Sequence, residues 1–275
     1  SDALQALAAA DFRADADPDH LQNPDGSTHI NLWYRLTTAF AEQELMEYAA
    51  VPQHRSAVWY PSVGIYAARQ GSWVLGAKFG SNGDSHNHND TGSITVYKDG
   101  RPFLIDIGVE SYTKKTFSPQ RYEIWTMQSG WHNLPEFDPD GAAYQQQPGA
   151  AFAAAGVAVA DTLDSIAMDL APAYGAVPGL GYYRRAVRLT ADGLTLCDET
   201  DYPGEVALTL MSVEKPAADG STVQFGTLAA ARADGAVRIV TEAVAVTDAR
   251  LRQAWPDTLY RTRLYFTGQL ALTVF

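Results

Sequence analysis

The chain has 275 residues, of which 46% are apolar, and its formal net charge is −12. Such an apolar share indicates a folded protein with a sizeable core, built as one large β domain or two smaller domains. The acidic balance argues against nucleic acid and against anionic membranes as partners. No stretch reaches the roughly 18 apolar residues that a membrane span requires.

The protein could bind an anionic substrate only if a local patch of basic residues outweighs the negative electrostatic potential of the whole chain. Two short runs of cations are candidates for such a patch, although a solvated surface is the commoner role of such runs. The candidates are Lys114, Lys115 and Arg121 in one run, and Arg184 and Arg185 in the other.

The first 55 residues differ in character from the rest. The alanine-rich stretch "DALQALAAADF" predicts a marginal helix, and the polar residues 13–31 after it predict a linker. An amphipathic or extended piece is expected around Trp33 to Met46. We therefore interpret residues 1–55 as a partly helical linker or remnant that precedes a domain over residues 56–275.

From Trp59 onward the pattern changes to the period of two that is typical of strands. The runs "VGIYAARQ" and "SWVLGAKFG" are the first, and "TGSITVYKDGRPFLIDIG" predicts a hairpin that turns at Asp99-Gly100. A second hairpin is expected at Asp192-Gly193, and further short strands follow to the C-terminus. Short strands with Gly and Asp turns predict an all-β fold, an antiparallel β-sandwich.

Two features interrupt this strand pattern. Residues 111–180 contain few strand signals and predict a long irregular insertion, which in a compact β domain is usually functional or mobile. The only cysteine, Cys197, lies in the strand-like run "GLTLCDET" and is expected to be a buried thiol without a disulfide partner.

The polar run "GSNGDSHNHNDTG" at residues 80–92 holds two of the six histidines of the chain. In an extended segment, residues two apart point to the same side. His86 and His88 are therefore expected to project together, with Asp90 on that side if the geometry continues.

Two further residues favour a metal site beside this run. Pairing about the Asp99-Gly100 turn places Asp106 opposite Ile94 or Ser93, a few residues from His88. Asp106 is a carboxylate in the apolar run "FLIDIGV", where it needs a partner or a metal. With His132 in "WTMQSGWHNLP", the set of His88, Asp106 and His132 suits Zn²⁺ with one position left for water.

Other interpretations of these residues stay open. The polar run could form a turn that is stabilised by side-chain hydrogen bonds. Asp106 could instead accept hydrogen bonds from backbone N–H groups or pair with a lysine. A cupin-like metal enzyme also uses two histidines two apart on a strand. Its pattern requires a glutamate four or five residues after the second histidine, where this chain has Gly92 and Ser93.

The order of three motifs, "HNHND", an aspartate in "LIDIG" and then "HNLP", resembles the heparinase II/III-like family of bacterial polysaccharide lyases over about residues 70–140. The resemblance implies the C-terminal β-sandwich domain of such an enzyme, with a zinc ion bound by His88, Asp106 and His132. It also implies that His86 faces the substrate cleft, with Tyr122 as a weaker candidate for a second cleft residue.

The activity that the resemblance implies is β-elimination on a uronic-acid-containing glycan, such as heparan sulfate or alginate. The principal catalytic residues of such lyases lie on an α/α toroid domain, for which residues 1–55 are too short. We therefore expect this chain to need a toroid domain as partner and to be inactive as a lyase alone. A bacterial, periplasmic or secreted location is favoured.

The alternative function is a carbohydrate-binding or purely structural sandwich without chemistry. In that case Trp125, Trp131 and Tyr122 would stack on sugar rings. In a β-sandwich, however, large aromatic residues belong to the core more often than to a binding surface.

Overall fold

The computed structural model describes residues 2–14, 32–49 and 55–275, which belong to two separate units, Ser1–Arg55 and Ser56–Phe275. Among these residues no helix is both long and apolar enough to cross a membrane. The two units are considered separately below.

The N-terminal unit contains two helices, α1 (Asp2–Ala14) and α2 (Leu32–Glu47). Ala6 and Ala9 are spaced by three residues, lie on one face of α1 and are buried. The Arg13 guanidinium donates hydrogen bonds to the carbonyls of Leu45 (3.1 Å), in the last turn of α2, and Tyr48 (2.8 Å), just after its end. The expected piece around Trp33 to Met46 is thus helical, and most of the expected linker, residues 15–31, lies outside the described residues.

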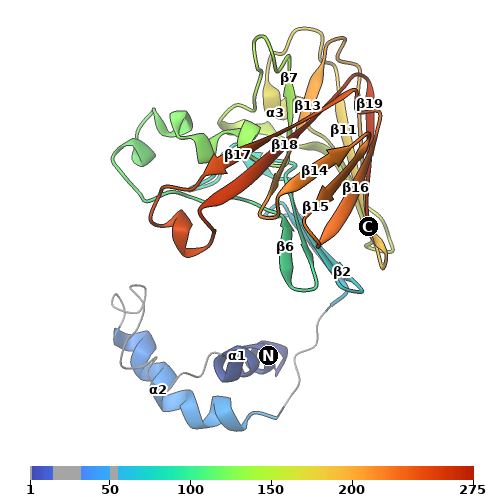
Figure 1. Ribbon diagram of the computed structural model, residues 1–275. Helices are drawn as coiled ribbons and strands as arrows, with labels where there is room; N and C mark the ends of the chain where they lie inside the picture. Colours follow the sequence, from blue (N-terminus) through green and yellow to red (C-terminus); the bar gives the residue numbers. More distant parts are fainter. Residues whose placement is uncertain (1, 15–31, 50–54) are drawn as a thin grey trace. The chain divides into compact units, whose positions relative to one another are not determined.

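The second unit is built from antiparallel sheets, as predicted for an all-β sandwich (Figure 1). The five-stranded sheet has the order β1 (Ala57–Tyr60), β2 (Ile65–Gln70), β3 (Trp73–Lys78), β5 (Ile94–Lys98) and β6 (Arg101–Leu104). The eight-stranded sheet has the order β14 (Pro216–Asp219), β15 (Thr222–Phe225), β16 (Ala229–Asp234), β19 (Gln269–Val274), β12 (Gly193–Thr200), β11 (Tyr183–Thr190), β10 (Ser165–Asp169) and β9 (Ala155–Val159).

Two smaller sheets complete the unit. One has the order β17 (Arg238–Ala245), β18 (Thr258–Phe266), β13 (Val206–Ser212) and β7 (Pro135–Phe137), and the other pairs β4 (Ser81–Asn82) with β8 (Gly149–Ala153). Short helical turns lie between strands: η2 (Lys115–Phe117), η3 (Arg121–Glu123), η4 (Trp125–Met127), η5 (Ser129–Trp131), α3 (Ala171–Tyr174) and η6 (Leu251–Gln253).

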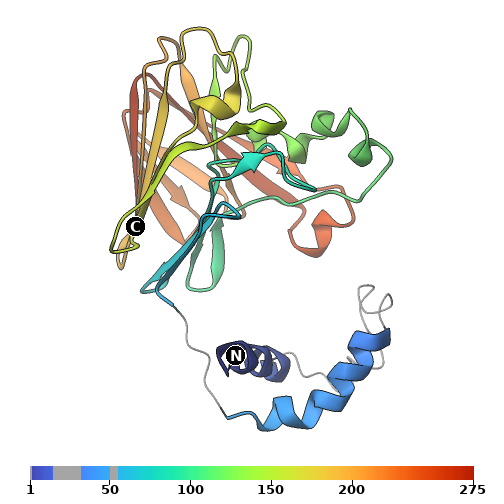
Figure 2. The ribbon, with the colours of Figure 1, turned by 180° about the vertical axis from the view of Figure 1, so that it is seen from behind.

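A main apolar cluster fills the space between the sheets, with Trp73, Phe103 and Phe225 among its largest members. Strand β11 alternates strictly between buried and exposed residues, as expected for a strand with one face on the core, whereas every residue of β13 is buried. A second, smaller cluster lies under the connections after β6 and β17 and contains Ile105 and Ile107. The reverse view shows how the long strands of the largest sheet form one wall of the sandwich (Figure 2).

The two predicted hairpins are present with small changes in register. In the β5–β6 hairpin, Lys98 pairs with Arg101 around Asp99-Gly100, and both turn residues have positive φ, 52° and 73°. In the β11–β12 hairpin the turn lies one residue earlier than predicted, because Thr190 pairs with Gly193.

The two C-terminal turns have another role. Strand β16 belongs to the eight-stranded sheet and β17 to the four-stranded sheet, so the turn at Gly235 passes the chain between sheets. The turn between β18 and β19, at Gly268, does the same in the opposite direction. The two crossings lie side by side, because Gly235 packs against the backbone of Gln269.

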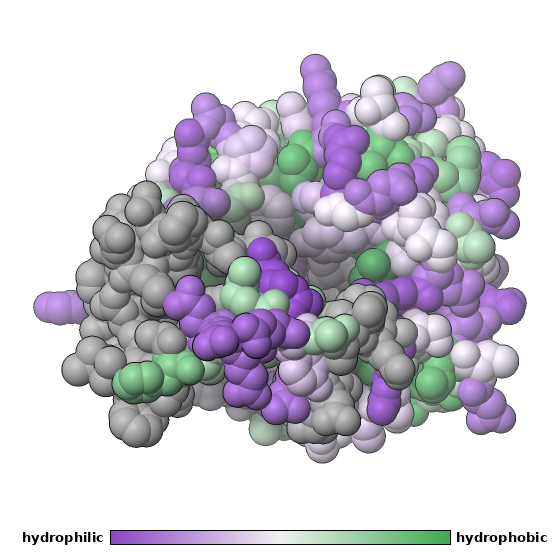
Figure 3. All heavy atoms as spheres, turned by 90° about the horizontal axis from the view of Figure 1, so that it is seen from below, coloured by the Kyte–Doolittle hydropathy of each residue, from purple (hydrophilic) through white to green (hydrophobic). Residues whose placement is uncertain are grey.

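Two expectations for the middle of the chain need correction. Residues 111–131 are irregular, with 3₁₀ turns, but the later part of the expected insertion forms β8, β9 and β10. Cys197 is exposed, because alternation along β12 turns Leu196 and Asp198 inward and the thiol outward. Figure 3 shows one face of the surface, where hydrophilic side chains project from many places and apolar residues lie between them in small groups.

A charged pair lies inside the sandwich. The guanidinium of Arg185 donates to both carboxylate oxygens of Asp198 (2.9 and 2.8 Å), and both side chains are fully buried. The hydroxyl of Tyr183 also donates to Asp198, at 2.6 Å. A buried charge without its partner is strongly destabilising, so this pair fixes the register between β11 and β12.

Asp198→Asn is expected to lower the free energy of unfolding by about 3–5 kcal/mol, because the charge of Arg185 stays buried without a counter-ion. Urea unfolding measures this change. Asp234→Asn is the matched control, since the Arg232–Asp234 pair has side chains that are 53% exposed and is expected to contribute little. Equal losses in the two variants would contradict the structural role of the buried pair.

Candidate metal centre

The acidic member of the expected metal set lies just after β6. This strand ends at Leu104, and the N–H of Ile105 donates to the carbonyl of Met211 in β13 (3.0 Å) instead of continuing the hairpin. Asp106 is therefore outside the hairpin ladder, contrary to the expected pairing opposite Ile94 or Ser93. Ile105 and Ile107 both point into the second apolar cluster, so the carboxylate between them points to the opposite side.

The polar loop that carries His86 and His88 is not extended. Residues 83–92 form turns, and His86 has a positive φ of 59°. The two imidazoles consequently point to different neighbours: His86 stacks on Tyr112, whereas His88 faces His132. The expectation that both project together is wrong, because it assumed strand geometry, and Asp90 instead pairs with Lys78.

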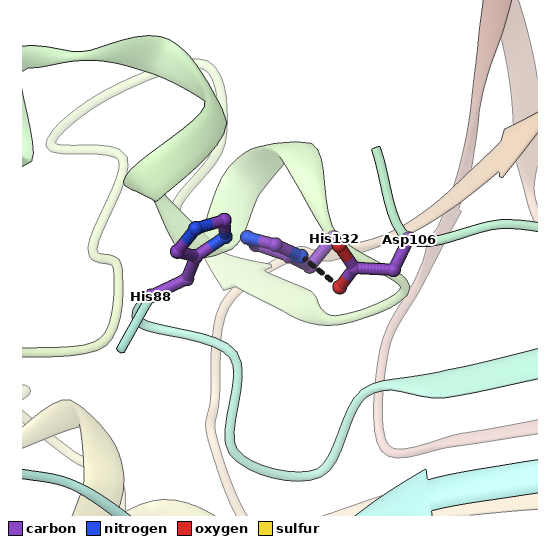
Figure 4. A group of neighbouring side chains, drawn as sticks. All are labelled: His88, Asp106 and His132. Carbon is purple, nitrogen blue, oxygen red and sulfur yellow. Dashed lines mark hydrogen bonds and ion pairs between the residues drawn. The ribbon is translucent and has the colours of Figure 1, made fainter. Parts of the chain in front are cut away.

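The expected metal set nevertheless converges. One ligand atom from each of His88, Asp106 and His132 can be chosen so that all lie within 4.8 Å of one another. His132 is fully buried, and its ring lies between the His88 ring and the Asp106 carboxylate (Figure 4). The ring centroids of His88 and His132 are 5.4 Å apart, and Nδ1 of His132 is 3.0 Å from Oδ2 of Asp106.

The hydrogen bonds around His132 and Asp106 determine which atoms are available to an ion. Nε2 of His132 lies 3.1 Å from the carbonyl of Thr126, which only accepts, so Nε2 carries the proton. Oδ1 of Asp106 accepts from the N–H of Gly108 (2.8 Å). The atoms left over are Nδ1 of His132 and Oδ2 of Asp106, which face each other. In metal sites, the polar atom of a ligand side chain that does not bind the ion is usually hydrogen-bonded in this way to a neighbouring group.

Without an ion, the contact between Nδ1 and Oδ2 requires a proton on Nδ1 as well, which makes His132 a cation. Burial alone would lower the pKa of His132, but the charge of Asp106 and its hydrogen bond outweigh burial and raise it. Burial would raise the pKa of Asp106, but the charge and hydrogen bond of His132 hold it well below its usual range. A proton on Nδ1 of His132 therefore lies between the two side chains, at the position that a metal cation would take.

His88 differs from these two ligands because no hydrogen bond fixes it. Within residues 55–275, neither ring nitrogen of His88 has a hydrogen-bond partner, although the residue is half-buried. Burial, and then the charge of His132, lower the pKa of His88 to about 4, so the imidazole is neutral near pH 7 with a free lone pair. An unpartnered imidazole of this kind is a ready metal ligand.

The residues fit Zn²⁺ in donor type: two imidazoles and one carboxylate, with satisfied outer contacts. Nδ1 of His132 and Oδ2 of Asp106, 3.0 Å apart, are already as close as two ligands of one ion, so His88 is the ligand that would have to approach. The unrestrained His88 side chain is the one free to make that movement. Asp106 also lines a pocket of about 290 Å³ with Lys78 and Asp90, which gives an ion a path to the carboxylate.

The other expected site residues surround the loop without joining the metal set. The hydroxyl of Tyr122 donates to Oδ1 of Asn87 (3.1 Å), and Tyr122 lines a polar pocket of about 400 Å³ with Asn89 and Gln128. Arg121 donates through Nε and Nη2 to the carbonyl of Asn87 (3.2 and 2.9 Å) and therefore holds the loop in place.

In each of the two expected basic patches, at least one cation interacts with another group of the protein. Lys115 pairs with Glu123 (3.0 Å), and Arg185 is buried against Asp198, so Arg184 and Arg185 do not share a surface. Trp125 and Trp131, the rings of the binding-module alternative, pack edge to face at 5.0 Å and lie against the second apolar cluster.

Asn133 is a structural member of this site that the sequence interpretation missed. Its Nδ2 donates to the carbonyls of Ile94 (2.7 Å) and Ile105 (3.1 Å), and its Oδ1 accepts from the N–H of Met211 (2.7 Å). Its own carbonyl accepts from Arg185 at 2.7 Å. Because Asn133 follows His132 and Ile105 precedes Asp106, this buried amide sets the distance between the two ligands. The motif "HNLP" contained it, but sequence alone does not show where its hydrogen bonds go.

The sequence pattern of the heparinase II/III-like C-terminal family matches residues 52–270. No protein of curated function matches the sequence. The fold is similar to that of a heparinase III (TM-score 0.60, 16% identity, 94% of this chain and 42% of that chain). It is also similar to heparan sulfate lyase HepC from Pedobacter heparinus (TM-score 0.59, 14% identity, 98% of this chain and 41% of that chain).

A third similar structure is a chondroitin AC lyase from Streptomyces coelicolor (TM-score 0.54, 10% identity, 98% of this chain and 38% of that chain). At these identities the likeness establishes the fold. The chain spans about two fifths of the length of the three structures, which match it over nearly its whole length.

Asn133→Asp is expected to lower the free energy of unfolding by about 2–3 kcal/mol, because the buried carbonyls of Ile94 and Ile105 lose their donor. Urea unfolding measures the loss. Gln224→Glu makes the same chemical change at an exposed amide that also donates to backbone carbonyls, and it is expected to have little effect. An Asn133→Asp variant as stable as Gln224→Glu would refute the assigned role.

Proposed function

This chain belongs to the heparinase II/III-like family through its C-terminal domain, and we propose that it serves as the β-sandwich domain of a polysaccharide lyase. The proposed substrate is an acidic, uronic-acid-containing glycan, and the proposed partner is an α/α toroid domain. The observation that carries the proposal is the convergence of His88, Asp106 and His132 beside an exposed histidine, His86, within the region that the family pattern covers.

The proposed reaction is β-elimination. A base removes the proton from the carbon next to the uronate carboxylate, and the electrons of that C–H bond form a carbon–carbon double bond. The bond to the glycosidic oxygen breaks, and this oxygen leaves with a proton from an acid. The products are an unsaturated uronate and a new sugar end.

His86 is the residue of this chain that is proposed to take part. It is exposed, and its Nδ1 lies 3.4 Å from the hydroxyl of Tyr112. Its positive φ of 59° is rare for a residue other than glycine and is a backbone conformation that clusters at functional sites. In the proposed role the imidazole transfers a proton or binds the substrate carboxylate.

The proposed metal role is structural. A bound Zn²⁺ would neutralise the carboxylate of Asp106 and replace the proton on Nδ1 of His132. His88, Asp106 and His132 would hold it, and they come from three chain segments that are distant in sequence. Fixing His88 would also fix the loop that carries His86 two residues earlier.

The alternative of a binding module without chemistry is less well supported. Its expected stacking rings, Trp125 and Trp131, have only part of their surface exposed and pack against the second apolar cluster. A periplasmic or secreted location in a bacterium is part of our proposal, since polymeric substrates are met outside the cytoplasm.

The purified chain is expected to contain about one equivalent of Zn²⁺, measured by mass spectrometry of the metal content. His88→Ala and Asp106→Asn are expected to lose the ion, because each removes one of three protein ligands. His86→Asn is the matched control: it changes a histidine two residues away that points elsewhere, and it should retain zinc. Zinc that stays bound in both ligand variants would exclude this metal site.

In the full-length lyase, with the toroid domain present, His86→Asn is expected to reduce kcat/KM at least 100-fold, within the range of general acid–base catalysis. Asparagine tolerates positive φ, so the loop should keep its conformation. The ultraviolet absorbance of unsaturated uronates measures turnover, and zinc content and unfolding serve as controls. Unchanged turnover in a folded, zinc-loaded variant would remove His86 from the reaction.

A further inference from the structure

Three aromatic rings meet on the surface beside the polar loop, and we call His86, Tyr112 and Phe117 the aromatic platform. The rings of His86 and Tyr112 are nearly parallel, with centroids 5.9 Å apart. Phe117 stands edge-on to both, 5.4 Å from Tyr112 and 6.2 Å from His86. Tyr112 is 43% exposed and Phe117 67% exposed, so both rings are partly open to solvent.

The platform is held in place by hydrogen bonds of its backbone. The N–H of Ser111 donates to both carboxylate oxygens of Asp248 (3.1 Å each), which ties this segment to the connection between β17 and β18. The N–H of Thr113 donates to the buried Thr116 hydroxyl at 3.0 Å, between the two platform residues. Figure 1 shows these two connections on the same side of the sandwich. Exposed rings fixed in this way are a surface prepared for a partner.

Two cations lie beside the platform, although the chain as a whole is acidic. The guanidinium of Arg250 lies over the Tyr112 ring, 4.9 Å from its centroid, and is exposed. Lys114, between Tyr112 and Phe117 in sequence, is exposed too. In the described part of the chain neither cation forms an ion pair with a carboxylate. The carboxylate of Asp248 is also close by and accepts the N–H groups of Ser111, Arg250 and Leu251, so it is oriented toward the backbone.

Rings with exposed apolar faces next to unpaired cations match the surface of an acidic sugar. The C–H groups of a sugar ring pack on aromatic faces, while its carboxylate or sulfate pairs with a guanidinium or an ammonium group. A neutral apolar ligand would not use the cations, and a simple anion would not use the rings. The combination selects a ligand that carries both features.

We propose that the aromatic platform, with Arg250 and Lys114, is a binding subsite for an anionic sugar ring of the glycan chain. The inference rests on the proposed function, and it adds residues that position the polymer next to His86. Tyr112 and Phe117 contribute stacking, and Arg250 contributes charge. Because His86 is itself part of the platform, a sugar bound there lies directly beside the imidazole.

The test measures binding by the chain itself and needs no turnover. Tetrasaccharides of heparan sulfate and of alginate, and a neutral cellulose tetrasaccharide, are titrated into the chain by calorimetry. The wild-type chain is expected to bind at least one acidic tetrasaccharide and to bind the neutral one at least tenfold more weakly. Phe117→Ala and Arg250→Gln are each expected to weaken acidic binding at least tenfold, and Arg250→Gln also to reduce its salt dependence.

Two surface changes serve as matched controls. Tyr60→Ala removes another ring that is 53% exposed, and Arg232→Gln removes another exposed guanidinium, so neither should change the affinity. The platform proposal is overturned if the wild-type chain binds no acidic tetrasaccharide, if it binds the neutral one equally well, or if Phe117→Ala has no effect. A Phe117→Ala variant that binds sugar normally but associates less with a separate toroid domain would identify a domain interface instead.

The test of the sugar-binding subsite can fail or succeed independently of the test of the proposed catalytic role of His86. Full activity of His86→Asn in the whole lyase, together with loss of sugar binding in Phe117→Ala, would refute the catalytic role and keep the subsite. Loss of turnover in His86→Asn with normal binding in Phe117→Ala would do the reverse.

Discussion

A single buried guanidinium connects the two histidine-bearing segments to the largest sheet. Arg185 pairs with Asp198 on the neighbouring strand and uses Nη1 to bind the carbonyls of Gly92 (2.8 Å) and Asn133 (2.7 Å). Gly92 closes the polar loop of His88, and Asn133 follows His132. Since a buried charge tolerates little change in its surroundings, both segments take up the rigidity of the β11–β12 ladder. The segments that carry His88 and His132 are thus anchored to the buried β11–β12 ladder through Arg185.

This support is uneven among the three ligands, and the difference is informative. His132 and Asp106 each have one atom fixed by the backbone, at Thr126 and Gly108, and their remaining atoms face each other. His88 has no such restraint. The candidate site therefore consists of a pair held by the backbone and a third side chain without such a restraint. Within the pair, a proton on His132 balances the charge of Asp106.

The sequence was sufficient for the fold class and for three side chains that the structure brings together, His88, Asp106 and His132, but not for the local path of the chain. Hydrophobic alternation and Asp-Gly turns predicted the sandwich and two hairpins, because these signals are local. The joint projection of His86 and His88 failed, since a residue with positive φ reverses the side-chain direction and alternation cannot foresee it. Asp106 was displaced from its hairpin because a tertiary contact, Ile105 to Met211, replaced the ladder. Asn133 was missed, and Arg185 was wrongly assigned to a basic surface patch, for a related reason: their roles lie in contacts between segments far apart in sequence, although a charged residue on the inward side of β11 was a visible signal.

The surface beside His86 differs from the interior in how well its groups are satisfied. Inside, buried polar groups are almost all paired, and the ion pair, the amide and the two ligands satisfy one another. Outside, His86 adopts a conformation that costs about 1 kcal/mol relative to ordinary backbone, and two neighbouring rings stay in water. Strain of this kind lowers folding stability, whereas recognition of a ligand would gain from groups that are already ordered before it arrives. The hydrogen bonds behind the loop help to hold this conformation: Arg121 and Arg185 bind its backbone at Asn87 and Gly92, on either side of His88, and Asn87 directly follows the strained His86.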